Sequence, residues 1–131
     1  MLGDSPAAAT LPVRDIESAR QFYEGVLGLT PAQMMPEDAP GAILYSSGGS
    51  MVLVYASEFV GTNQATAATW AVGDDFDAIV QGLRDKGVTF ERYDNLPDTV
   101  RDGDVHSFGD LKSVWFKDPD GNILNVGNAA P

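Results

Sequence analysis

The strongest constraint on the fold is that the chain presents the same order of elements twice. Apolar residues at helical spacing follow Asp15 and end at Gly28, and a similar stripe follows Asp75 and ends at Gly87. A cap residue before such a stripe and a glycine after it predict an amphipathic helix in each half. One predicted strand precedes each helix and three follow it. The repeat therefore predicts two βαβββ modules of about 60 residues each.

The predicted strands occupy corresponding places in the two halves. Their ranges are 7–13, 30–36, 41–47 and 51–55 in the first half, and 66–72, 88–93, 111–117 and 122–127 in the second. Gly48-Gly49 and Asp120-Gly121 are typical of the tight turns that close a hairpin, and each falls before the last strand of its half.

The remaining segments lack the periodicity of a helix or a strand. Segment 57–65 is expected to link a first module, residues 1–56, to a second module, residues 66–131. The acidic segment 94–110 is predicted to be a long loop, which either is solvated or serves as a lid.

Composition limits the classes of function. A chain of 131 residues, with 44% hydrophobic and 21% charged residues, can form an ordinary globular core. Its 19 acidic and 8 basic residues give a formal charge of −11, which disfavours nucleic acid and anionic lipid as partners. The absence of cysteine removes disulfides and thiolate metal sites. No signal-peptide pattern or membrane-spanning run is found, so a cytoplasmic location is expected.

Three parts of the sequence resemble the vicinal oxygen chelate superfamily, which includes glyoxalase I, extradiol dioxygenases and bleomycin-resistance proteins. They are residues 12–16 continuing into 22–29, residues 74–88, and the segment WFKDPDGN at 115–122. The resemblance implies an α+β fold in which two βαβββ modules form a curved mixed sheet around a cavity, with the helices on its outer face. Since this fold hosts lyases, isomerases, dioxygenases and drug-binding proteins, it does not choose among these functions.

Enzymes of this superfamily, as the resemblance implies, hold a divalent metal through His, Gln or Glu side chains on the first and last strands of each module. Counting from the two helix starts and the two glycine turns places the corresponding positions at Ala8, Leu53, Ala68 and Asn125. Three of these side chains have no donor atom, and an asparagine amide is a poor ligand for a first-row metal. We therefore expect no metal and no other cofactor at these positions.

Side chains two residues away on a strand share one face, so the neighbours of these positions are expected to line the cavity. The predicted ligand-binding residues are Met51, Leu53, Tyr55, Trp70, Trp115 and Asn125, with Arg101 and His106 from the predicted loop. An apolar and aromatic wall with a few polar groups is typical of a small-molecule pocket. Ordinary core packing is the alternative for each aromatic residue.

The resulting hypothesis is a metal-independent protein that sequesters a small apolar or aromatic molecule, as in antibiotic resistance. The alternative is a glyoxalase-type lyase or isomerase, with His106 supplying acid–base chemistry or, with Asp102, Asp104 and Asp110, an unconventional metal site. These readings leave open whether the chain is an enzyme. By resemblance to proteins of this fold, a homodimer is expected.

Overall fold

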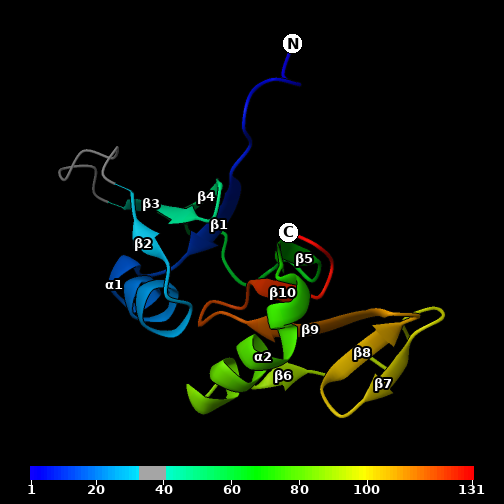
Figure 1. Cartoon of the computed structure of the whole chain (residues 1–131). Coiled ribbons are helices and arrows are strands. Elements are labelled where there is room, and N and C mark those ends of the chain that lie inside the picture. Colours follow the sequence, from blue (N-terminus) through cyan, green and yellow to red (C-terminus); the bar gives the residue numbers. More distant parts are fainter. Residues whose placement is uncertain (33–40) are drawn as a thin grey trace. The chain divides into compact units, whose positions relative to one another are not determined.

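The computed structural model describes residues 1–32 and 41–131 (Figure 1). The structure is of the α+β class and divides into two compact units. The first contains Met1–Asn63 and Asp118–Asn122, and the second contains Gln64–Lys117 and Ile123–Pro131. Most of the predicted strand 30–36 falls outside the described residues.

The first unit has the predicted βαβββ order. Its elements are β1 (Ala9–Val13), α1 (Ile16–Arg20), the π-helix η1 (Gln21–Val26), β2 (Thr30–Pro31), β3 (Ala42–Ser47) and β4 (Ser50–Ala56). They form a four-stranded sheet in the order β1-β4-β3-β2. The first strand, β1, runs parallel to the last, β4, and the other pairs are antiparallel. Ser47 faces Ser50 across the β3–β4 hairpin, which confirms the predicted Gly48-Gly49 turn.

The predicted first helix begins where its sequence indicates. The Asp15 side chain accepts hydrogen bonds from the backbone N–H groups of Glu17 and Ser18, as an N-cap does. Beyond Arg20 the helix widens into a π-helix, which the sequence pattern did not predict. Gly25, a poor helix former, lies in this wider turn.

The core of the first unit follows the alternation of its strands. On β4, Val52 and Val54 are buried while their neighbours are more exposed. The buried rings of Tyr23 and Tyr45 stack with their centroids 6.1 Å apart, so η1 packs beside β3. This packing places one face of the sheet against the helix and leaves the opposite face more open.

The second unit has the same order, with two additional strands. Its elements are β5 (Thr66–Ala71), the 3-10 turn η2 (Gly73–Asp75), α2 (Phe76–Asp85), β6 (Phe90–Glu91), β7 (Val100–Asp102), β8 (Val105–Phe108), β9 (Leu111–Lys117) and β10 (Ile123–Gly127). They form a six-stranded sheet in the order β5-β10-β9-β8-β7, with β6 also paired to β9. As in the first unit, the first strand runs parallel to the last.

The predicted loop 94–110 is wrong for most of its length, because residues 100–108 form the β7–β8 hairpin. Asp102 faces Val105 across this hairpin, which leaves Gly103 and Asp104 as the turn. Gly103 has a φ of +61°, a conformation that glycine adopts without strain. A two-residue loop with glycine first, here Gly103-Asp104, is itself a hairpin signal, so the information was present in the sequence.

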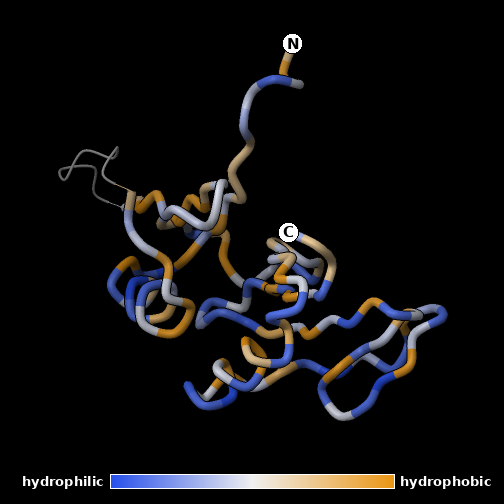
Figure 2. Tube along the Cα trace, viewed as in Figure 1, coloured by the Kyte–Doolittle hydropathy of each residue, from blue (hydrophilic) through white to orange (hydrophobic). Residues whose placement is uncertain are grey.

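Helix α2 covers one face of the second sheet. The guanidinium of Arg84 on α2 lies 5.5 Å from the ring centroid of Phe90, and Phe90 contacts Phe116 of β9 edge to face. The other side chains buried on this face or on the helix are Phe76, Val80, Leu83, Val114, Leu124 and Val126. Figure 2 shows the hydrophilic turn that follows the strand β9. Among the described residues, no helix has the length and apolar content needed to cross a membrane.

Candidate functional site

Three of the predicted ligand-binding residues share the open face of β4. Met51, Leu53 and Tyr55 alternate with the buried Val52 and Val54, so their side chains point away from the core. Tyr55 is 37% exposed. These three residues therefore form a continuous row on the first unit, as the sequence predicted.

The first-strand metal position, Ala8, lies just before β1 and carries no donor atom. On β1 itself, Thr10 is the residue that faces Leu53 across the pair of strands. Leu53 is also without a donor. The first unit thus offers no imidazole or carboxylate at either metal position of the superfamily.

Two predicted residues of the second unit are direct neighbours. Trp115 of β9 faces Asn125 of β10, so both side chains lie on the face of the sheet opposite α2. The Asn125 Nδ2 amide donates a hydrogen bond of 3.0 Å to the backbone oxygen of Val114. That bond ties the buried amide to the sheet, and it orients the remaining side-chain oxygen.

The prediction that Trp70 and Ala68 share this face is wrong. Trp70 faces Val126 and Ala68 faces Leu124, whereas Thr69 is the residue beside Asn125. Since paired residues on adjacent strands point to the same side, Trp70 and Ala68 lie on the α2 side.

The physical reason for this error is a one-residue difference between the two halves. In the first unit Asp15 caps the helix directly, but in the second unit the turn η2 (Gly73–Asp75) intervenes between β5 and α2. The register between β5 and β10 also shifts between Ile123 and Leu124. Counting back from Asp75 therefore selects the wrong face of β5.

His106 is buried in the sheet rather than solvated in a loop. It lies on β8 and is only 1% exposed, which corrects its predicted place in a loop. Its ring centroid lies 5.8 Å from that of Tyr93 and 5.0 Å from that of Trp115. We call Tyr93, His106 and Trp115 the aromatic cluster. Two predicted site residues are thus brought together, with a third that the sequence did not indicate.

The hydrogen bonding of His106 limits its chemistry. Its Nε2 atom accepts a hydrogen bond of 2.9 Å from the backbone N–H of Tyr93, so the neutral ring carries its hydrogen on Nδ1. Within the described part of the chain, Nδ1 has no hydrogen-bond partner. Because the basic nitrogen is already engaged, His106 is poorly arranged to act as a general base.

A pocket of about 250 Å³ lies in the second unit next to the aromatic cluster. Its lining residues are Gln64, Ala65, Thr66, Tyr93, Leu96, Trp115 and Ile123. The indole Nε1–H of Trp115 donates a hydrogen bond of 3.1 Å to Thr66 Oγ1, which fixes the ring in the wall. Of the residues predicted from the sequence, only Trp115 belongs to this lining.

Tyr93 supplies a polar group that is available to a ligand. Burial, and secondarily the nearby Glu91 carboxylate, raise the pKa of Tyr93, so the phenol stays protonated at neutral pH. Its hydroxyl forms no hydrogen bond with the residues that the structure describes. The one sequence signal for Tyr93 was its place at the end of the predicted strand 88–93, and that signal did not mark it as a site residue.

Arg101 is engaged in an ion pair rather than free to close over a ligand. Its Nε atom lies 2.6 Å from Asp94 Oδ1, and its Nη1 donates to the backbone oxygen of Gly103. The hydrogen bond from Arg101 lowers the pKa of Asp94. Arg101 faces His106 across β7 and β8, so it stands at the edge of the aromatic cluster.

The residues present do not fit a metal centre. At the metal positions of the superfamily, Ala8, Leu53 and Ala68 have no donor atoms, and Asn125 offers only one neutral amide oxygen, a poor ligand for a first-row metal. In segments 1–32 and 41–131, no three His, Asp or Glu side chains are grouped so that they could hold a metal ion. Asp104, considered as part of an unconventional site, is instead paired with two arginines.

Comparison with known proteins identifies the family. The model of the Glyoxalase/Bleomycin resistance protein/Dioxygenase superfamily matches residues 6–126. The chain belongs to this superfamily, which confirms the resemblance noted in the sequence. No match was found among curated proteins.

Solved structures confirm the fold. The antibiotic binding protein TnmS3 from Streptomyces sp. CB03234 is 20% identical, with a TM-score of 0.62 over 99% of each chain. The fosfomycin resistance protein FosX from Mesorhizobium loti is 16% identical, with a TM-score of 0.66 over 97% of this chain and 93% of that chain. A glyoxalase/bleomycin resistance protein/dioxygenase from Alicyclobacillus acidocaldarius is 18% identical, with a TM-score of 0.67 and coverages of 95% and 90%. At these identities the similarity concerns the fold alone.

Proposed function

We propose that the chain binds a small apolar or aromatic molecule without a metal and sequesters it rather than converting it. The observation that carries this proposal is the pocket beside the aromatic cluster, whose wall includes Trp115 and Tyr93. Aromatic walls with a few polar groups are the usual composition of ligand pockets. A cytoplasmic homodimer remains part of the proposal, by resemblance to proteins of this fold.

The size and chemistry of the pocket define the class of ligand. Its volume of about 250 Å³ is slightly below the range of roughly 300–1,000 Å³ for ligand sites, which suits a molecule of one or two rings. A planar ring would pack on Trp115, and the Tyr93 hydroxyl would donate to an oxygen or nitrogen of the ligand. Thr66 and Gln64 add polar groups at the wall.

Two of the superfamily structures support this class of function by analogy. One is an antibiotic binding protein and another is a fosfomycin resistance protein. Met51, Leu53 and Tyr55 remain proposed ligand contacts on the open face of β4. The alternative, a glyoxalase-type lyase or isomerase, gains no support from His106, because its basic nitrogen accepts a backbone hydrogen bond.

Tryptophan fluorescence tests the proposal, because the chain has only two tryptophans. In the variant Trp70→Phe, Trp115 is the remaining fluorophore, and in Trp115→Phe it is Trp70. Titration with a panel of aromatic antibiotics and metabolites should give a saturable change in the wild type and in Trp70→Phe. The change should be lost or strongly reduced in Trp115→Phe.

Tyr93→Phe serves as the test of the polar contact. It should weaken binding of the responding compound by about tenfold, the effect of one hydrogen bond of about 1.4 kcal/mol. If Trp70→Phe is folded by circular dichroism and its fluorescence is unchanged by every compound, the pocket is not the binding site and the proposal fails.

A further inference from the structure

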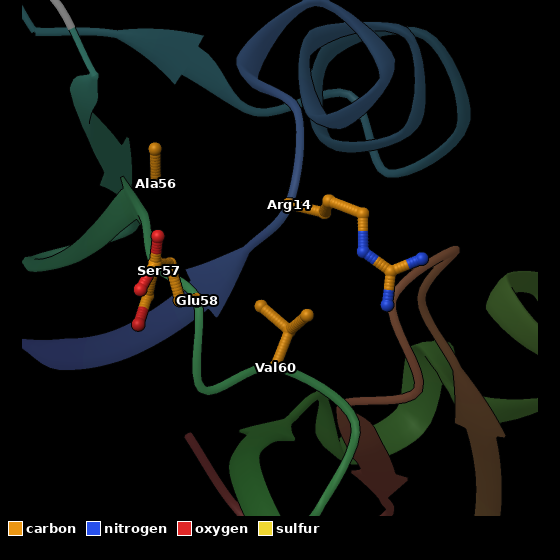
Figure 3. A pocket seen from close by; sticks show the side chains of 5 residues that line it. All are labelled: Arg14, Ala56, Ser57, Glu58 and Val60. Atoms are coloured by element: carbon orange, nitrogen blue, oxygen red, sulfur yellow. The ribbon is translucent and has the colours of Figure 1, made fainter.

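We propose that the first unit contains a second ligand site, which binds a small zwitterion through Arg14 and Glu58. The site is a pocket of about 460 Å³ lined by Arg14, Ala56, Ser57, Glu58 and Val60 (Figure 3). It shares no residue with the pocket of the second unit. The two proposals can therefore fail independently.

Backbone pairing brings the two walls of this pocket together. Val13 faces Ala56 across β1 and β4, and the Ser57 N–H donates a hydrogen bond of 2.9 Å to the Val13 backbone oxygen. Arg14 follows Val13 directly, so it lines the pocket from the segment between β1 and α1, with its guanidinium on the side away from Ala56 and Ser57 (Figure 3). The other lining residues come from the end of β4 and the segment after it, as Figure 3 shows.

Arg14 is distinguished from most of the other basic residues by having no acidic partner. Five of the 8 basic side chains form ion pairs, and these are Arg20, Arg84, Arg92, Arg101 and Lys117. Arg14 forms none with the described residues, although the chain has 19 acidic residues. The neighbouring Asp15 is not available, because its carboxylate caps α1 through Ser18 and Glu17.

Glu58 supplies the complementary charge on another part of the pocket. No ion pair joins it to Arg14 or to any other basic residue in the described ranges, and Figure 3 shows the two charged groups on different sides of the pocket. The Ser57 hydroxyl accepts a hydrogen bond of 3.1 Å from the Phe59 N–H, which leaves its own hydrogen free to donate. Ala56 and Val60 form the apolar part of the lining.

This arrangement matches a ligand with an anionic group at one end and a cationic group at the other. A carboxylate would accept hydrogen bonds from the Arg14 guanidinium, and an ammonium on the opposite side would donate to Glu58, which lies beside Ser57 (Figure 3). The methylene chain between them would contact Ala56 and Val60. A simple anion is less suitable, because the chain carries a charge of −11 and Glu58 lies in the same pocket.

Amide and guanidinium NMR signals test this site with three probes of similar length: aminohexanoate, hexanoate and hexylamine. Aminohexanoate should cause saturable shifts in the Arg14 Nε–H signal and in the amide signals of Ser57 and Val60. Hexanoate and hexylamine each pair with only one of the two charged residues. Each should therefore bind at least about tenfold more weakly than aminohexanoate. Saturable binding of aminohexanoate no stronger than that of hexanoate would overturn the assignment.

Charge-removing variants locate the two contacts. Arg14→Gln and Glu58→Gln should each weaken aminohexanoate binding by about tenfold, the effect of one charge-assisted hydrogen bond. The matched controls are Lys112→Gln, which removes an exposed basic group outside the pocket, and Glu17→Gln, which removes an exposed acidic group on α1. The controls should leave binding unchanged. Equal effects of the control and pocket variants, or no saturable shift in the folded wild type, would refute the proposal.

Discussion

At the residue scale, the carboxylate of Asp118, at the start of the turn between β9 and β10, accepts four hydrogen bonds. It is 4% exposed and accepts hydrogen bonds from the Tyr23 hydroxyl at 2.7 Å, the Asp120 N–H, the Asn122 N–H and the Asn122 side-chain amide. The same Asn122 amide donates to the Pro12 backbone oxygen. A buried carboxylate is tolerated only when it is satisfied in this way.

Tyr23 depends on the same carboxylate. Burial, together with the charge of Asp118 and the hydrogen bond to it, raises the pKa of Tyr23 far above its ordinary value. The phenol therefore stays protonated and acts as a donor at neutral pH. The sequence predicted the turn at Asp120-Gly121 and the helix that carries Tyr23, but it did not predict that Asp118 accepts from a residue 95 positions earlier.

Removing this carboxylate should destabilise the protein strongly. Asp118→Ala should lower the free energy of unfolding by about 3 kcal/mol, because it leaves buried donors unsatisfied, and Tyr23→Phe should lower it by about 1 kcal/mol. Urea denaturation measures both effects. Asp110→Ala, at an exposed aspartate, is the matched control and should change stability by no more than about 0.5 kcal/mol. A cost for Asp118→Ala no larger than that of the control would contradict the role described.

At the element scale, an ion-pair network connects α2 with the turn of the β7–β8 hairpin. Asp104 in that turn lies 3.1 Å from Arg84 on α2 and 3.1 Å from Arg92, which follows β6. Burial by itself would raise the pKa of Asp104, but the hydrogen bonds from the two arginines outweigh it and lower that pKa. Asp104 thus connects the β7–β8 hairpin, which the sequence analysis had assigned to a loop, to the predicted helix α2.

The lowered pKa fixes the sign of a pH effect. The contribution of Asp104 to stability should be complete above the ordinary aspartate pKa of about 3.9 and should disappear as the pH falls below that value. Because the arginine side chains are 41% and 56% exposed, the contribution should not exceed about 1 kcal/mol.

Urea denaturation of the wild type and of Asp104→Asn at several pH values measures this contribution as a difference. The difference cancels the effect of the other acidic residues, which titrate in both proteins. It should be constant at neutral pH and shrink as the pH falls below about 3.9, the ordinary aspartate pKa. A difference that grows as the pH falls would show that the network does not act as described.

At the scale of the whole molecule, the chain keeps the fold of its superfamily, while the superfamily's metal positions carry side chains that do not suit a metal. Ala8 and Leu53 have no donors, and Asn125 offers only one neutral amide oxygen. Corrected for the register of β5, the second-unit position moves from Ala68 to its neighbours Ala67 and Thr69, which are not metal ligands of the imidazole or carboxylate type. Neither neighbour of Ala68 therefore restores a metal site.

Added metal should therefore leave the stability of the protein unchanged. A metal that binds the folded state at about 100 times its dissociation constant would add about 2.7 kcal/mol to the free energy of unfolding. Thermal denaturation with zinc, nickel or manganese, and again after chelator, should give the same midpoint in each case. A rise with one metal that the chelator reverses, or stoichiometric metal in protein purified without chelator, would contradict this expectation.

The elements that the sequence predicted well are those whose signals are local. Asp15 caps its helix through its own next residues, and the strand 111–117 is found at its predicted bounds. The repeat also gave the correct order of elements in both units. Caps, glycine turns and alternating strands act over a few residues, so they can be recognised in the sequence without knowledge of distant contacts.

The tertiary structure decided which side chains meet. Trp70 turned to the α2 face because the register between β5 and β10 shifts by one residue, and a one-residue slip reverses every side chain of a strand. His106 is buried beside Trp115 because β7 and β8 extend the sheet. The sequence alone therefore determined the family and the order of the elements. It also determined that the residues at the superfamily's metal positions do not suit a metal. The pocket, the aromatic cluster and the bonds of Asp118 depended on pairing between residues far apart in the chain, which no local pattern encodes.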